Sequence, residues 1–207
     1  MRGIVPHAPA SPAAAVVPCY SSTAMNRGSE AFSAEFEAVA PSLFAWVVLR
    51  LPSEVRSLLE PEDVLQEVAC RAFEQIDRFD AAVGSFRSWA FGIARNVLRE
   101  ALRFLARHPT RKGSDQLATE WIHQVPDPAT SISRRVVRDE SLRRVVERLA
   151  RLPEDDRRLL LYRGLEGLEH GEVGRILGVT VEAAEKRWQR LRDRLHELGL
   201  PDGLIAA

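Results

Sequence analysis

The sequence predicts an all-α fold of two small helical domains joined by a flexible linker. Three observations support this prediction. Apolar residues recur at helical spacing in several segments, and strand-like alternation is almost absent. A stretch rich in Pro, Gly, Asp and Thr separates two such blocks. The second block contains a short helix, a tight turn and a longer helix, which is the pattern of a helix-turn-helix.

These patterns divide the chain of 207 residues into five parts. We expect residues 1–30 to be disordered, because prolines interrupt any apolar segment of the signal-peptide kind. Met25 is a candidate translation start, since organised sequence begins near Phe32. The other parts are a first domain at residues 31–106, a linker at 107–132, a second domain at 133–199 and a C-terminal tail at 200–207.

Composition excludes several classes of protein. Basic and acidic residues each total 29, so the net charge does not indicate a nucleic-acid partner. Cys19 and Cys70 lack the spacing of a disulfide scaffold or zinc site, which favours a cytoplasmic protein without a metal. No run of about 18 apolar residues is present, so we expect no membrane span. The histidines are scattered and no nucleophile or phosphate-loop motif occurs, so we expect neither an enzyme nor a cofactor.

The segment from Glu62 to Ile76 predicts an amphipathic helix. Its apolar arc, which we expect to be core, comprises Val64, Leu65, Val68, Ala69, Ala72, Phe73 and Ile76. The opposite, polar arc comprises Asp63, Gln66, Glu67, Cys70, Arg71 and Glu74. Such an arc is usually only solvated. A cysteine among acids is also consistent with a partner surface, because cysteine is seldom fully exposed.

The segment from about Ser85 to Leu105 predicts a longer helix. Its apolar face comprises Phe86, Ala90, Ile93, Ala94, Val97, Ala101 and Phe104. On the other face, Trp89, Asn96 and Arg103 are spaced by seven residues and form a stripe. Bases stack on aromatic rings and guanidinium groups neutralise phosphates, so this face suits single-stranded nucleic acid. The alternative is that Trp89 packs against a neighbouring helix among solvated arginines.

Residues Leu168 to Leu195 predict the helix-turn-helix. Gly178 suits a left-handed turn, and Thr180 can cap the second helix. We expect the buried arc of that helix to comprise Val181, Ala184, Trp188, Leu191 and Leu195. The exposed arc is basic, as entry into the major groove requires, although a generic charged hairpin is the alternative. The residues expected to contact duplex DNA are Thr180, Glu182, Ala183, Lys186, Arg187, Arg190 and Arg194.

Both blocks resemble the extracytoplasmic-function (ECF) sigma factors, bacterial subunits that direct RNA polymerase to promoters. The segments similar to region 2 of that family are Pro61 to Val68, Phe79-Asp80, Gly84 to Trp89 and Ile93 to Asn96. The segments similar to region 4 are Leu152-Pro153, Gly167-Leu168, Glu172-Val173, Ile176 to Gly178 and the spacing of Arg187, Arg190, Arg192 and Leu195.

The resemblance implies that the polar arc at residues 62–76 docks on the clamp helices of the polymerase's largest subunit, while region 4 contacts the other large subunit. Region 4 would bind the minus-35 promoter element as duplex, region 2 would bind the minus-10 element as melted strand, and the linker would cross the polymerase's active-site channel. The resemblance implies that the loop from Arg78 to Arg87 and the helix face with Trp89 and Asn96 bind the minus-10 element. The individual residues implied are Arg78, Phe86, Arg87, Ser88, Trp89, Arg95, Asn96, Arg99 and Arg103. The free chain would be a monomer, with an anti-sigma factor as a further candidate partner.

Three features depart from the family pattern. Glu169 stands where the family commonly has a capping Ser, which weakens the helix cap by roughly 1 kcal/mol. Gly171 and Gly174 lie in the same short helix, and each costs about 1 kcal/mol relative to Ala unless close packing requires it. Glu185 replaces a residue that is often basic, so the promoter sequence cannot be taken from relatives.

Two other hypotheses predict different behaviour. An autonomous helix-turn-helix regulator would bind duplex DNA as a dimer without polymerase. A module that sequesters another transcription factor would tolerate the loss of Asn96. The sequence indicates neither the regulon nor the inducing stimulus, and it gives no role to residues 1–30 or to Cys70.

Overall fold

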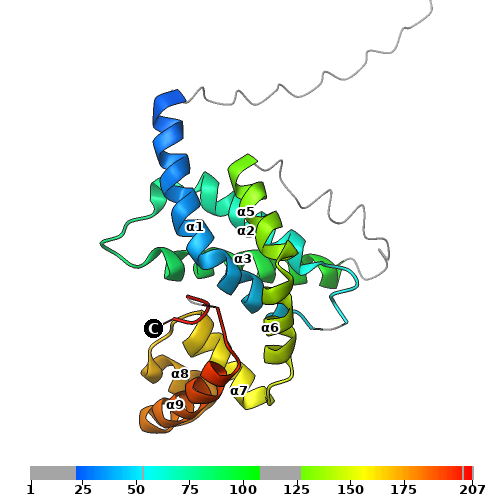
Figure 1. The fold of residues 1–207 in the computed structure, drawn as a ribbon, viewed down its shortest axis with the longest axis vertical. Coiled ribbons are helices and arrows are strands. Elements are labelled where there is room, and N and C mark those ends of the chain that lie inside the picture. The colour runs from blue at the N-terminus through cyan, green and yellow to red at the C-terminus, as the bar shows by residue number, and fades with distance from the viewer. Residues whose placement is uncertain (1–21, 53, 108–126, 202, 207) are drawn as a thin grey trace, which may run out of the picture.

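The computed structural model describes residues 22–52, 54–107, 127–201 and 203–206 (Figure 1). The predictions for residues 1–21, Cys19 included, and for most of the linker lie outside this part of the chain. Within the described residues every regular element is helical, which confirms the all-α prediction. The helices form an N-terminal group and a C-terminal group, and one continuous hydrophobic core extends through both.

The N-terminal group comprises α1 (Ser22–Arg50), α2 (Pro61–Glu74), the 3₁₀ turn η1 (Ile76–Arg78), α3 (Phe86–Arg107) and α5 (Asp127–Arg138). Helix α1 begins within the segment expected to be disordered, residues 1–30. Helix α5 begins within the predicted linker and packs on both α1 and α2. The end of the predicted linker is therefore part of the first helix group.

Helix α1 is central to the core of this group, where Phe32, Phe36, Leu43 and Trp46 are buried. Although no membrane span was expected, the stretch Phe32–Arg50 is long and apolar enough to cross a membrane by length and composition alone. More than half of that stretch is buried inside the protein, so the core accounts for its apolar character.

The predicted apolar faces of α2 and α3 lie in the core. In α3 every predicted residue is buried except Phe104, which is half-buried. Phe91 and Leu98 are buried as well, outside the predicted face. Phe91 meets the ring of Trp46 edge-on with a centroid separation of 5.9 Å, so α3 is packed on more than one side.

The C-terminal group follows helix α6 (Glu140–Ala150), which packs on α1 and α5. It comprises α7 (Glu154–Leu159), the π-helical turn η2 (Leu160–Leu165), α8 (His170–Leu177) and α9 (Val181–Glu197). The π-helical turn η2 continues directly from α7. Its backbone hydrogen bonds join residues five apart instead of four, so the helix is wider there than in α7.

The predicted turn chemistry of the helix-turn-helix is confirmed. Gly178 ends α8 in the left-handed conformation, with φ 69° and ψ 33°. The Thr180 hydroxyl caps α9 by accepting a hydrogen bond from the Ala183 backbone N–H at 3.2 Å. The predicted buried arc is confirmed except at Val181, which is 47% exposed. That part of the prediction is wrong because Val181 is the first residue of α9 and lies beyond its packed face.

The departures in α8 have different consequences. Glu169 precedes α8 without a side-chain cap hydrogen bond, as expected for a residue that replaces Ser. A Cβ at Gly174 would lie 2.9 Å from the Val179 carbonyl oxygen, whereas a Cβ at Gly171 would have no neighbour within 4 Å. Close packing against the turn therefore requires glycine at 174 and not at 171.

Candidate nucleic-acid and polymerase interfaces

A pocket of about 270 Å³ opens where η1 and the following loop meet the start of α3. Its lining residues are Arg78, Phe79, Asp80, Val83, Gly84, Ser88 and Trp89. Arg78, Ser88 and Trp89 were predicted individually, and the other four lie in the loop from Arg78 to Arg87 that the resemblance implies. Val83 is 86% exposed. Its neighbours Ala81, Ala82 and Gly84 are small and apolar, so no sequence pattern singles it out.

The aromatic wall of this pocket is held in place by ring contacts. Trp89 lies 5.4 Å from Phe79 and 5.3 Å from Phe86 between ring centroids. Trp89 thus packs on neighbouring side chains, as the alternative interpretation stated, and also lines the pocket. Phe86 is buried, so its place is in the support of the pocket rather than on its surface. Asp80 fixes the loop by accepting a hydrogen bond from the Ala82 backbone N–H at 2.9 Å.

The predicted stripe continues from the pocket along α3. Asn96, Arg99 and Arg103 are exposed. Arg99 donates a hydrogen bond to the Asn96 side-chain oxygen at 3.2 Å, which leaves the Asn96 amide N–H groups directed to other partners. An aromatic wall, an amide and exposed arginines therefore follow one another on one helix, which is an arrangement suited to stacked bases and phosphates.

The exposed face of α9 presents most of the residues predicted for duplex DNA, whereas Ala183 is half-buried. Glu182, Lys186, Arg187 and Arg190 are exposed. The pKa of Glu182 is lowered by a hydrogen bond from its own backbone N–H and by the Thr180 side chain, so it stays charged at the helix start. Arg194 differs from the others, because it forms an ion pair with Asp156 of α7 at 2.6 Å.

The polar arc of α2 is less exposed than a solvated face would be. Glu67 and Cys70 are both 0% exposed. Arg71 forms ion pairs at 2.6 Å with Glu67 and with Glu100 of α3. Burial raises the pKa of Cys70 to about 12, assisted by the charge of the neighbouring Glu74. Of the remaining predicted docking residues, Asp63 and Gln66 are half-buried and Glu74 is exposed.

The chain matches the family models of Sigma-70 region 2 over residues 36–108 and Sigma-70 region 4 over residues 142–195. The RNA polymerase sigma factor NccH of Alcaligenes xylosoxydans is 30% identical over 153 residues, which cover 72% of this chain and 80% of that protein. The ECF RNA polymerase sigma factor SigC of Mycobacterium tuberculosis is 31% identical over 144 residues, which cover 69% and 72% respectively. The chain belongs to the ECF sigma factors.

The resemblance stated from the sequence is thereby confirmed, and this sigma factor directs transcription initiation. The share of the relative's own length that the match covers differs from one relative to the next. The probable RNA polymerase sigma factor RfaY of Xanthomonas campestris is 31% identical over 137 residues, which cover 66% of this chain and 33% of that protein. No solved structure matches the chain significantly.

In this sigma factor, two predicted minus-10 residues of region 2 face region 4. Arg87 donates hydrogen bonds to the carbonyl oxygens of Leu165, Gly203 and Leu204 at 2.9, 3.2 and 3.0 Å. Arg95 forms an ion pair with Glu166 at 2.7 Å. Burial lowers the pKa of Arg87 to about 10, so the side chain is still charged near neutral pH. Both side chains are therefore engaged within the chain.

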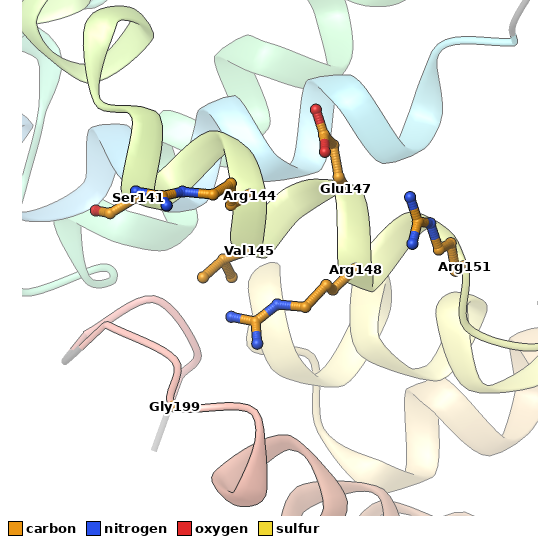
Figure 2. Close-up of a pocket in the computed structure, with 7 residues that line it drawn as sticks. All are labelled: Ser141, Arg144, Val145, Glu147, Arg148, Arg151 and Gly199. Atoms are coloured by element: carbon orange, nitrogen blue, oxygen red, sulfur yellow. The ribbon is translucent and has the colours of Figure 1, made fainter.

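A larger pocket, of about 530 Å³, lies along α6 (Figure 2). Its lining residues are Ser141, Arg144, Val145, Glu147, Arg148, Arg151 and Gly199. None of these was among the predicted site residues. Arg144, Arg148 and Arg151 are exposed, so region 4 has a basic surface along α6 in addition to the one on α9.

Proposed function

We propose that this sigma factor binds core RNA polymerase in the cytoplasm and recognises two promoter elements through separate surfaces, without chemistry of its own. Region 4 binds the minus-35 element as duplex, and region 2 binds the minus-10 element as melted strand. The observation that carries the proposal is that one chain holds both an exposed basic helix after a glycine turn and a pocket with an aromatic wall.

The region 2 pocket supports capture of an unstacked base. Taking a base out of the duplex costs a few kcal/mol, so the pocket that receives it has to be preformed. Ring contacts already fix Trp89 against Phe79 and Phe86, and the Asp80 hydrogen bond fixes the loop. Arg78 at the pocket and Arg99 and Arg103 along α3 are placed to neutralise the adjoining phosphates.

The α9 face supports recognition of duplex DNA. A helix enters the major groove with its first turns near base edges and its basic residues near phosphates. Lys186, Arg187 and Arg190 are exposed on one face, and the Thr180 cap orders the first turn. A charged Glu182 can accept a hydrogen bond from a cytosine amino group, which is one way in which the promoter sequence is selected.

Polymerase docking uses the polar arc of α2 for the clamp helices of the largest subunit, and region 4 for the other large subunit. Glu74 is the exposed member of that arc, and Asp63, Gln66 and Arg71 are half-buried. Glu67 and Cys70 are buried, so their participation requires that α2 be uncovered. The free protein is a monomer, and an anti-sigma factor would compete for the same surfaces.

Run-off transcription tests this proposal. The purified protein is mixed with core RNA polymerase that lacks any sigma subunit, and genomic fragments of the source organism serve as templates. Transcripts with discrete, mapped start sites are expected. Stable duplex binding by a dimer, with no transcription, would instead favour an autonomous helix-turn-helix regulator.

Trp89→Ala tests the pocket on a promoter mapped in this way. Transcription should fall roughly 5- to 150-fold, because stacking on an aromatic ring contributes about 1–3 kcal/mol per base. Duplex binding by region 4 should be unchanged. Val83→Asp is a second variant, since Val83 lines the pocket and is exposed, and its folding is checked by thermal unfolding. Full transcription by both folded variants would contradict the assignment of the pocket.

A further inference from the structure

Few large hydrophobic side chains are exposed on this sigma factor. Within the described residues there are three, Val83, Ile176 and Val181, which are 86%, 37% and 47% exposed. None of the three packs against the hydrophobic core. Val83 lines the region 2 pocket, and the other two lie on either side of the turn of the helix-turn-helix. All three therefore lie at or beside the surfaces proposed to bind nucleic acid.

Val181 occupies the position on α9 that is closest to the bases in a bound duplex. It is the first residue of the helix, and the N-terminal residues of the second helix of a helix-turn-helix contact base edges in the major groove. Glu182 and Lys186, which were predicted to contact DNA, are exposed on the same helix. Helix formation does not account for a valine here, because β-branched residues are not favoured in helices and half of this side chain is in solvent.

The turn before α9 fixes the position of Val181. The Val179 backbone N–H donates a hydrogen bond to the Gly174 carbonyl oxygen at 3.0 Å, which ties the turn to α8. The Thr180 hydroxyl then caps α9 through the Ala183 backbone N–H at 3.2 Å. Valine also has one strongly preferred χ1 rotamer in a helix. A contact made by this side chain therefore costs little conformational entropy on binding.

The group that an aliphatic side chain can recognise in the major groove is the thymine methyl. Each base pair presents a different set of groups there, and the C5-methyl of thymine is the apolar one. The carboxylate of Glu182 is suited instead to the amino group of cytosine. The first two residues of α9 are thus complementary to two different features of base edges, one apolar and one polar.

We propose that Val181 is a specificity-determining residue of region 4, which packs against the methyl group of a thymine in the minus-35 element. This inference rests on the proposed function, because it concerns a base within the duplex that region 4 is proposed to bind. The contact removes the methyl group and the valine side chain from water, so it favours binding without any charge. It distinguishes thymine from cytosine, which has no methyl group at this edge.

Deoxyuridine tests the contact, because it differs from thymidine only by the missing methyl group and keeps the same base pairing. The holoenzyme is reconstituted from the full-length protein and core polymerase, and the duplex spans the minus-35 element of a promoter mapped by run-off transcription. Each thymine of the element is replaced in turn. At one position the wild type should bind about fourfold more weakly, which is the effect of one methyl-sized apolar contact. The loss should be the same between about 50 and 200 mM KCl, since a methyl contact releases no counterions.

Two full-length variants assign the contact to a residue. Val181→Ser replaces the aliphatic side chain by a small polar one, so this variant should bind the thymine and uracil duplexes equally. Ile176→Ser is the matched control, because it removes an exposed aliphatic side chain from the same motif but from α8, and it should keep the wild-type preference. Circular dichroism and thermal unfolding establish that both variants are folded, and the scan with the wild type depends on neither.

A minus-35 element without a thymine, or equal affinity of the wild type for thymine and uracil at every position, would overturn the inference. A preference for thymine that Val181→Ser retains would also overturn it, because another residue would then contact the methyl group. If the wild-type holoenzyme does not distinguish the minus-35 element from a scrambled duplex, the proposed role of region 4 fails and the inference with it. Specific binding with full tolerance of uracil leaves that role intact and removes only the role of Val181.

Discussion

The two proposed nucleic-acid surfaces of this sigma factor differ in how far they are exposed in the free chain. On region 4, Lys186, Arg187 and Arg190 extend into solvent from a capped helix. On region 2 the pocket is open, but Arg87 and Arg95 are bound by region 4. A duplex element is always present in the genome, whereas a melted element exists only after polymerase has opened the promoter. Of the two proposed surfaces, the one that is partly covered is the one whose ligand is present only transiently.

Cys70 offers the largest expected effect, because it tests whether the polar arc of α2 is covered. With its pKa raised to about 12, only about one thiol in ten thousand is ionised at pH 8, compared with roughly a quarter at an ordinary pKa near 8.5. In a Cys19→Ser background, alkylation by iodoacetamide at pH 8 should be at least about a thousandfold slower in the native chain than in urea.

The sign of the pH dependence follows from the raised pKa. The thiolate is the reactive form, so the native rate should rise about tenfold for each pH unit between 8 and 11 while the fold persists. If Cys70 of the folded chain is alkylated as fast as in urea, its thiol is accessible. The polar arc of α2 would then not be a covered surface.

Arg190→Ala tests the open surface. Holoenzyme affinity for a duplex minus-35 element should fall by about 1–3 kcal/mol, and assembly with core polymerase should be unchanged. Arg148→Ala is the control, since Arg148 is an exposed arginine of α6 outside the α9 face. Equal losses from the two variants, in a mobility-shift titration, would mean that general charge rather than α9 determines binding.

The two glycines of α8 give the smallest effect and test whether the helix-turn-helix is preformed. Gly171→Ala should raise the free energy of unfolding by about 1 kcal/mol or slightly less, because alanine is the better helix former and has room there. Gly174→Ala should lower the free energy of unfolding, since its Cβ would meet the Val179 carbonyl oxygen. Urea titrations of both variants measure the difference, and equal shifts would contradict the packing of the turn.

Part of the fold could be predicted because it is encoded locally. Helical spacing located α2, α3, α8 and α9, whereas α1, α5 and α6 were not predicted. Gly178 and Thr180 marked the turn and cap that the structure contains. The pocket could be predicted only in part. Trp89 belongs to a helical pattern and was predicted as a site residue, whereas Phe79 lies in an irregular loop and was not predicted individually. Local signals of this kind do not depend on distant parts of the chain.

The covered surfaces could not be predicted, because a helical wheel does not identify the segment that packs on a polar arc. Glu67 and Cys70 have the spacing of solvated residues and yet are buried. Glu166 stands in an ordinary charged stretch, and its partner Trp46 is 120 residues away in sequence. Residues 203–206 carry no motif, and their bonds to Arg87 use backbone carbonyl groups available in any sequence.

The use of carbonyl groups by the tail has a practical and an evolutionary consequence. Since backbone carbonyl groups accept the bonds from Ser42 and Arg87, the number of residues between α9 and Leu204 is constrained. Side chains in the segment are constrained as well, because Gly203 has a φ of 75° and Leu204 is buried. Insertions and deletions in this segment should therefore be rare among orthologues. A bulky group joined directly to this segment should disturb its bonds to Ser42, Arg87 and Gly164.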